Sequence, residues 1–118
     1  MKHHKKTRTL GRKKGQRAAL LRSLVRSLIL AGGITTTIAR AKELRPFVEK
    51  LISASKINTI ASRRTVSSRL GGSPDAVFEL HQKIAPGFKK RIGGYTRIVR
   101  LGRVGKRAIE SARIELVK

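Results

Sequence analysis

The sequence predicts an α+β fold of about four helices packed on a small sheet of about three strands, preceded by a basic arm. Four segments carry apolar side chains at the helical period of about 3.6 residues, and three segments are β-branched or alternate between apolar and polar residues. Leu10 is the only large aliphatic residue among the first 15. At 118 residues the chain has the length of one domain. We therefore expect an extended arm at residues 1–15 and a single α+β domain at residues 16–118.

Residues 16 to about 30 predict the first helix, which ends at Gly32-Gly33. Its apolar residues fall on one stripe: Leu20, Leu21, Leu24, Val25 and Leu28. The β-branched segment Ile34–Thr37 predicts a short strand. Thr37 suits the N-cap of a second helix at residues 38–55. Pro46 should kink this helix or split it near Arg45, and Phe47 could use the bend to reach the core.

Two more helices are expected before residue 85. Asn58 or Thr59 caps the first of them, which runs to about Leu70 and ends at Gly71-Gly72. Its apolar face is thin and consists of Ile60, Ala61 and Val66. Ser73-Pro74-Asp75 combines a capping hydroxyl, a proline at the first helical position and an acid in the first turn. The helix that starts there should run to about Ile84, bury Val77, Leu80 and Ile84, and be closed by Pro86-Gly87.

The C-terminal part predicts two strands joined by a turn. Tyr95 to Leu101 alternates between outward and inward residues, residues 102–106 resemble a loop, and Ala108 to Val117 forms the partner strand. In that second strand, Ile114 and Leu116 should face the helices, and Arg113 and Glu115 should point outward.

The charge of the chain indicates its class of partner. There are 29 Lys and Arg against 6 Asp and Glu, a net charge of +23, and no acidic residue precedes Glu43. Repulsion of this size opposes compaction unless a polyanion screens it, and each cation bound to a phosphate releases counterions. No apolar run approaches the roughly 18 residues of a membrane span. The predicted partner is therefore nucleic acid and not a membrane.

Four aromatic residues are too few for a surface that stacks single-stranded bases, which favours contact with folded nucleic acid. The predicted RNA contacts in the arm are Lys2, His3, His4, Lys5, Lys6, Arg8, Arg12, Lys13 and Lys14. Those in the domain are Arg17, Arg22, Arg91, Tyr95, Arg97, Arg100 and Arg103. A solvated tail and an ordinary polar sheet face are the alternatives for the basic residues. Tyr95 can contact RNA, or it can lie at the edge of the core with its hydroxyl in water.

No catalytic, cofactor or metal site is predicted. Three His without Cys, among scattered carboxylates, do not form a metal site, and no carboxylate pair has the setting of a general acid and base. We expect a protein without enzymatic activity, cofactor or small-molecule substrate. A DNA-compacting architectural protein is the alternative, and it would usually insert an apolar wedge or an arm into the minor groove. A nuclease or RNA-modifying enzyme would need clustered carboxylates or a cofactor loop.

Five segments resemble one known family in order and spacing. They are LGR at Leu10–Arg12, RAAL at Arg17–Leu20, TTTIARAKELRPFVEKLI at Thr35–Ile52, RIGGYTRIV at Arg91–Val99 and IEL at Ile114–Leu116. Together they resemble the bacterial-type large-subunit ribosomal protein seventeen family over nearly the whole chain. The resemblance implies helices on a small sheet with a basic arm.

The resemblance also implies a non-catalytic structural component of the large ribosomal subunit near the polypeptide exit. Its partners would be large-subunit ribosomal RNA and neighbouring large-subunit ribosomal proteins. We accordingly expect a cytoplasmic, ribosome-bound location, with an organellar ribosome less favoured.

Overall fold

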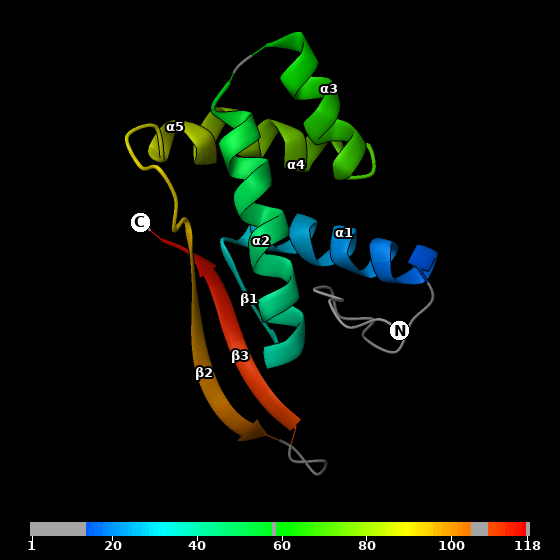
Figure 1. Cartoon of the computed structure of the whole chain (residues 1–118), viewed down its shortest axis with the longest axis vertical. Coiled ribbons are helices and arrows are strands. Elements are labelled where there is room, and N and C mark those ends of the chain that lie inside the picture. The colour runs from blue at the N-terminus through cyan, green and yellow to red at the C-terminus, as the bar shows by residue number, and fades with distance from the viewer. Residues whose placement is uncertain (1–13, 58, 105–108, 118) are drawn as a thin grey trace, which may run out of the picture.

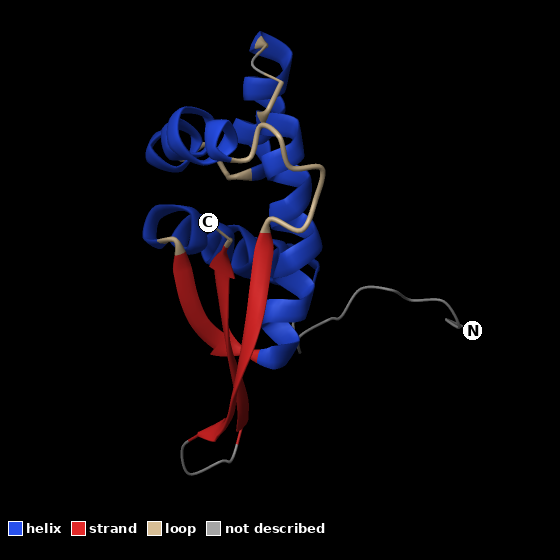
Figure 2. Cartoon of the chain, turned by 90° about the vertical axis from the view of Figure 1, so that its left-hand side faces the viewer, coloured by secondary structure: helices blue, strands red, loops and turns tan. Residues whose placement is uncertain are grey.

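In a computed structural model, which describes residues 14–57, 59–104 and 109–117, helices pack on a three-stranded antiparallel sheet (Figure 1). The elements are, in order, α1 (Lys14–Ala31), β1 (Gly33–Thr37), α2 (Ile38–Ser55), α3 (Ile60–Arg69), α4 (Pro74–Glu79), the π-helical turn η1 (Leu80–Ile84), α5 (Ala85–Gly87), β2 (Thr96–Val104) and β3 (Ile109–Leu116). The predicted α+β fold is confirmed. The β2–β3 hairpin extends away from the helices (Figure 2).

Helix α2 begins and ends at the predicted residues. Thr37 is extended, and its hydroxyl accepts a hydrogen bond from the Arg40 N–H at 3.2 Å, which satisfies one of the donors left open at a helix N-terminus. Pro46 lies inside the helix, which continues through it, so the predicted split is wrong. Proline removes one backbone donor, and the buried face on both sides of it, including Leu44 and Val48, keeps the chain helical.

Helix α3 starts as predicted, but its buried face is smaller. The Thr59 hydroxyl accepts a hydrogen bond from the Ser62 N–H at 3.1 Å. Val66 is buried, whereas Ile60 is 69% exposed and Ala61 is also exposed. The first turn of α3 lies at the end of the molecule far from the sheet (Figure 1), and it contacts α2 through the Ser62 hydroxyl, which donates to the Ala54 carbonyl. Of the predicted thin apolar face, only Val66 is buried.

The next helix starts at Pro74 as predicted but runs beyond Ile84 to Gly87. A π-helical turn interrupts it, in which the Ala85 N–H donates to the Leu80 carbonyl five residues earlier. Pro86 lies in the first turn of α5, a position that proline tolerates, so Pro86-Gly87 does not close the helix where predicted. The extra residue of a π turn changes the helical register. Leu80, Ala85 and Phe88 are all buried.

Strand β3 is the centre of the sheet, between β1 and β2. Ile114 pairs with Ile34 and Ile98 and belongs to the core. Strand β2 continues to Val104, three residues beyond its predicted end at Leu101. A bulge between Arg100 and Gly102 takes Leu101 out of register, and Gly102 adopts the left-handed φ of +83°. Gly102, at which the predicted loop begins, is instead part of this bulge. The predicted turn residues 105–106 and Ala108 lie outside the described residues.

His81 lies in η1 with both ring nitrogens buried, and neither has a hydrogen-bond partner among the described residues. Burial is the main cause that lowers the pKa of His81, and nearby Arg63 lowers it further. The nearby backbone of Ser55 raises the pKa of His81, but it is not placed to form a hydrogen bond with the imidazole. The neutral imidazole is therefore favoured in the folded protein.

This shift predicts that acid destabilises the fold through His81. The unfolded chain binds the proton more readily, so the contribution of neutral His81 is complete above the unfolded pKa of 6.5 and is lost as the pH falls through the lowered folded-state pKa. Between about pH 7 and about pH 5, the thermal midpoint should fall more in the wild type than in His81→Gln. Circular dichroism melts at constant ionic strength measure this. Parallel pH profiles in the two proteins would contradict it.

Candidate nucleic-acid interface

The predicted RNA contacts fall into three sets in the structure. Eight lie outside the described residues: Lys2, His3, His4, Lys5, Lys6, Arg8, Arg12 and Lys13. Lys14 begins α1, which also carries Arg17 and Arg22. The others lie on β2 or on the loop before it. We call Arg97, Arg100, Arg103 and Arg113 the hairpin surface, and residues 89–94 the basic loop. The hairpin surface includes both faces of the β2–β3 ladder, because Arg97 pairs with Glu115 on the outer face whereas Arg100 pairs with the buried Ala112 on the other.

The arginines of the hairpin surface meet carboxylates that the sequence analysis did not place near them. Arg97 donates to Glu115 through Nε at 3.0 Å and through Nη2, and Arg113 Nε donates to the other oxygen of Glu115 at 3.2 Å. Arg100 Nη1 donates to Glu110 Oε1 at 2.9 Å. Strand β3 supplies both carboxylates, across the ladder for Arg97 and Arg100 and two residues along the same strand for Arg113.

These ion pairs are exposed and therefore weak. The side chains of Arg97 and Arg100 are 62% and 61% exposed, and pairs of this kind contribute about 0–1 kcal/mol. Hydrogen bonds from Arg97 first, and then from Arg113, lower the pKa of Glu115, so this carboxylate stays ionised at neutral pH. Four arginines face two carboxylates, and the hairpin surface remains basic. Arg113, which was predicted only to point outward, belongs to it.

Tyr95 lies in the core and not on the surface. Its side chain is 1% exposed and its ring centroid is 5.1 Å from that of Phe88. The hydroxyl accepts a hydrogen bond from Lys56 Nζ at 2.6 Å and lies 3.1 Å from each of the Arg91 and Ile92 carbonyls, to which it can donate. The hydrogen bond from Lys56 lowers the pKa of Tyr95. Stacking on an RNA base does not fit this burial, and the hydroxyl is bonded to protein groups.

Helix α2 and the residue that caps it hold the basic loop at Arg91 and at Gly94. The C-cap residue Lys56 donates to the Arg91 carbonyl as well as to Tyr95. About two turns earlier in the helix, Glu49 accepts from the Gly94 N–H at 3.3 Å and from Thr96 Oγ1 at 2.8 Å. The loop between these anchors is exposed, including Arg91, and Ile92 is 97% exposed. Tyr95 and Lys56 thus position the loop that presents Arg91.

Arg17 and Arg22 of α1 line a hollow of about 400 Å³ together with residues of α2 and α3. Arg69 and Ser68 come from α3, and Glu43 and Phe47 from α2. The sequence analysis did not predict Arg69 as a contact residue. Its place near Arg17 and Arg22 comes from tertiary packing, which leaves no pattern in the neighbouring sequence.

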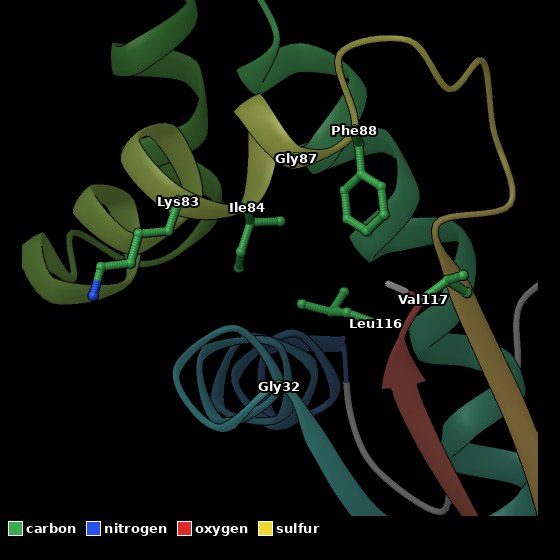
Figure 3. Close-up of a pocket in the computed structure, with 7 residues that line it drawn as sticks. All are labelled: Gly32, Lys83, Ile84, Gly87, Phe88, Leu116 and Val117. Carbon is green, nitrogen blue, oxygen red and sulfur yellow. The ribbon is translucent and has the colours of Figure 1, made fainter.

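A second hollow, of about 300 Å³, lies between the segment formed by η1 and α5 and the end of β3 (Figure 3). Ile84, Phe88 and Leu116 point into it, and the amine of Lys83 points away. An apolar lining of this kind does not attract an anion. In the described part of the chain, no three His, Cys, Asp or Glu side chains are grouped to hold a metal ion. No helix there is long and apolar enough to cross a membrane.

Comparison with known proteins identifies a family for this chain. Residues 20–117 match the family model described as "Ribosomal protein L17". The chain is 47% identical over 117 residues to the large ribosomal subunit protein bL17 of Gemmatimonas aurantiaca, covering 99% of this chain and 98% of the relative. It is 48% identical over 120 residues to the protein of the same name from Sulfurihydrogenibium sp., covering 100% and 98%. The protein of that name from Fusobacterium nucleatum is 44% identical over 117 residues, covering 99% and 100%.

The ion pairs of the hairpin surface predict that Glu115 restrains binding to RNA. Glu115→Gln removes the carboxylate that holds Arg97 and Arg113, so affinity for large-subunit ribosomal RNA should rise about 3- to 10-fold and depend more steeply on salt. Filter binding over a series of salt concentrations measures both. Glu79→Gln is the matched control, since it makes the same charge change beside Lys83, away from the sheet. Equal gains in the two variants would show that only net charge matters.

Proposed function

This chain belongs to the ribosomal protein L17 family, and on that premise we propose that it binds large-subunit ribosomal RNA by neutralising its phosphates. The family is a structural part of the ribosome and not an enzyme, in agreement with the sequence analysis. The observation that supports the RNA contact most is the surplus of arginine over carboxylate on the hairpin surface and around the hollow lined by α1, α2 and α3.

In the proposed mechanism, cationic side chains neutralise the phosphates of neighbouring RNA segments, which would otherwise repel one another. The helices and sheet share one apolar core, and basic groups on α1, on the basic loop and on the hairpin contact phosphates on several sides of it. Each such contact releases condensed counterions, which adds affinity without reading the base sequence. The residues of the arm, from Lys2 to Lys14, extend the same neutralisation to neighbouring RNA.

The proposal also includes where on the ribosome the protein lies. We expect the protein on the cytoplasmic ribosome, near the polypeptide exit region and in contact with neighbouring large-subunit ribosomal proteins. The relatives are large ribosomal subunit proteins that match this chain over nearly its full length, which supports a place in the large subunit.

Binding that rests on phosphate neutralisation should weaken steeply with salt. The log of the affinity for large-subunit ribosomal RNA should fall linearly with log salt, with a slope of about −0.7 to −0.9 for each phosphate contact. Filter binding of the full chain measures the slope, and duplex DNA of equal charge is the competitor. A slope near zero would refute the mechanism. Competition by DNA as effective as by ribosomal RNA would favour the architectural alternative. Co-migration with the large subunit through a high-salt gradient tests the location.

Removal of residues 2–13 tests the arm separately. The described helices begin at Lys14, so the shortened protein should keep its helical circular dichroism and lose RNA affinity about 10-fold or more. Loss of helical signal would show instead that the arm stabilises the fold. Unchanged affinity would show that the arm does not contact RNA.

A further inference from the structure

The hollow between α1, α2 and α3 brings together arginines from distant parts of the sequence. Arg17 and Arg22 come from α1 and Arg69 from the last turn of α3. Ser68, Glu43 and Phe47 complete the polar and aromatic lining, and Ala18 and Leu21 of α1 add apolar side chains. We call this hollow of about 400 Å³ the three-helix hollow. Arg22 and Arg69 are 47 residues apart in the sequence, so only tertiary packing brings them to one hollow.

The close approach of α1 to the end of α3 depends on Gly71. A Cβ at this position would lie 3.4 Å from Arg22 Cδ and 3.1 Å from Arg26 Nη1, and the φ of +71° disfavours other residues. Arg26 Nη1 also donates to the Leu70 carbonyl at 3.2 Å. Arg26 thereby satisfies a carbonyl at the end of α3, and its contact brings Arg22 beside the turn that follows Arg69.

The charges of the three-helix hollow do not balance within the protein. Three guanidinium groups line it with one carboxylate, that of Glu43. Like charges gathered in one concavity repel, and an anion bound there offsets the repulsion. Guanidinium groups bind phosphate with two parallel hydrogen bonds, and the Ser68 hydroxyl offers a further donor. The lining therefore has the chemistry of an oxyanion site.

We propose that the three-helix hollow is a discrete binding site for one backbone phosphate of folded ribosomal RNA. This inference rests on the proposed function. It goes beyond that function because it assigns one phosphate to a defined site, where the proposed function requires only a general attraction between α1 and RNA. Arg22 and Arg69 hold the phosphate from two sides, and Arg26 and Gly71 position them. RNA phosphate fits better than an acidic protein segment, because the hollow lies on the helix that carries the basic arm.

A comparison of two arginines on α3 tests the site. Arg69 lines the hollow, whereas Arg64 lies on the same helix, is also exposed and is outside it. Arg69→Ala should lower the affinity of the full chain for large-subunit ribosomal RNA about 10-fold and reduce the salt slope by about one, while Arg64→Ala should change affinity less than about 3-fold. Circular dichroism melts confirm that both variants fold.

Lysine at the same position separates the guanidinium fork from its charge. Arg69→Lys keeps one positive charge, so the salt slope should stay that of the wild type. The parallel hydrogen bonds of the fork are lost, and the affinity should still fall about 3-fold or more. Full recovery of affinity by lysine would overturn the defined site in favour of simple charge.

The outcomes distinguish this inference from the proposed function. If the wild type itself fails to bind ribosomal RNA, the proposed function is refuted. If the wild type binds and Arg69→Ala matches Arg64→Ala, only the phosphate site is refuted. A variant Arg69→Ala that binds free RNA normally but is lost from purified large subunits would overturn the site as well, and would assign the hollow to an acidic segment of a neighbouring protein.

Discussion

Repulsion among cationic side chains is the constraint on which the rest of this structure depends. The chain has six Asp and Glu for 29 Lys and Arg. Among the described residues, Glu49, Glu79, Glu110 and Glu115 form ion pairs along a helix or within the β2–β3 hairpin. Six acids are too few to neutralise 29 cations, so the folded chain keeps a large positive surplus that a bound polyanion would screen.

The apolar core and the charged surface are coupled through α2. One face of this helix is buried, with Leu44, Val48 and Leu51 in the core. Glu49 of this helix and the C-cap residue Lys56 anchor the basic loop at Gly94 and at Arg91, and they also bond Thr96 and Tyr95. The position of the loop therefore depends on a helix that is fixed in the core. The buried Tyr95 positions a surface loop through its hydroxyl, a role that residue type and charge context alone did not indicate.

Elements specified by neighbouring residues were predictable, and features made by distant residues were not. Thr37 and Thr59 set helix starts through capping hydroxyls, which confirms the prediction. The helix after Ser73 starts at Pro74 as predicted, but the Ser73 hydroxyl makes no capping hydrogen bond, so that part of the prediction is wrong. Gly102 has the same local signal in a loop and in a bulge, so the longer β2 required knowledge of its partner strand. The ion pairs of Arg97 and Arg100, and the place of Arg69 beside α1, arise only from strand register and helix packing.

The two basic surfaces should contribute differently to RNA affinity. A phosphate that meets Arg97 or Arg100 must displace a carboxylate already bound there, so part of the new attraction replaces an existing one. Three arginines and one carboxylate line the three-helix hollow, against four arginines and two carboxylates on the hairpin, so a phosphate there would meet fewer competing carboxylates for each arginine. Exposed pairs are weak, so the exchange on the hairpin would cost little and remain reversible. On the proposed function, a strong contact on the helices combined with an exchangeable one on the hairpin would let the protein engage one RNA segment first and adjust to the next.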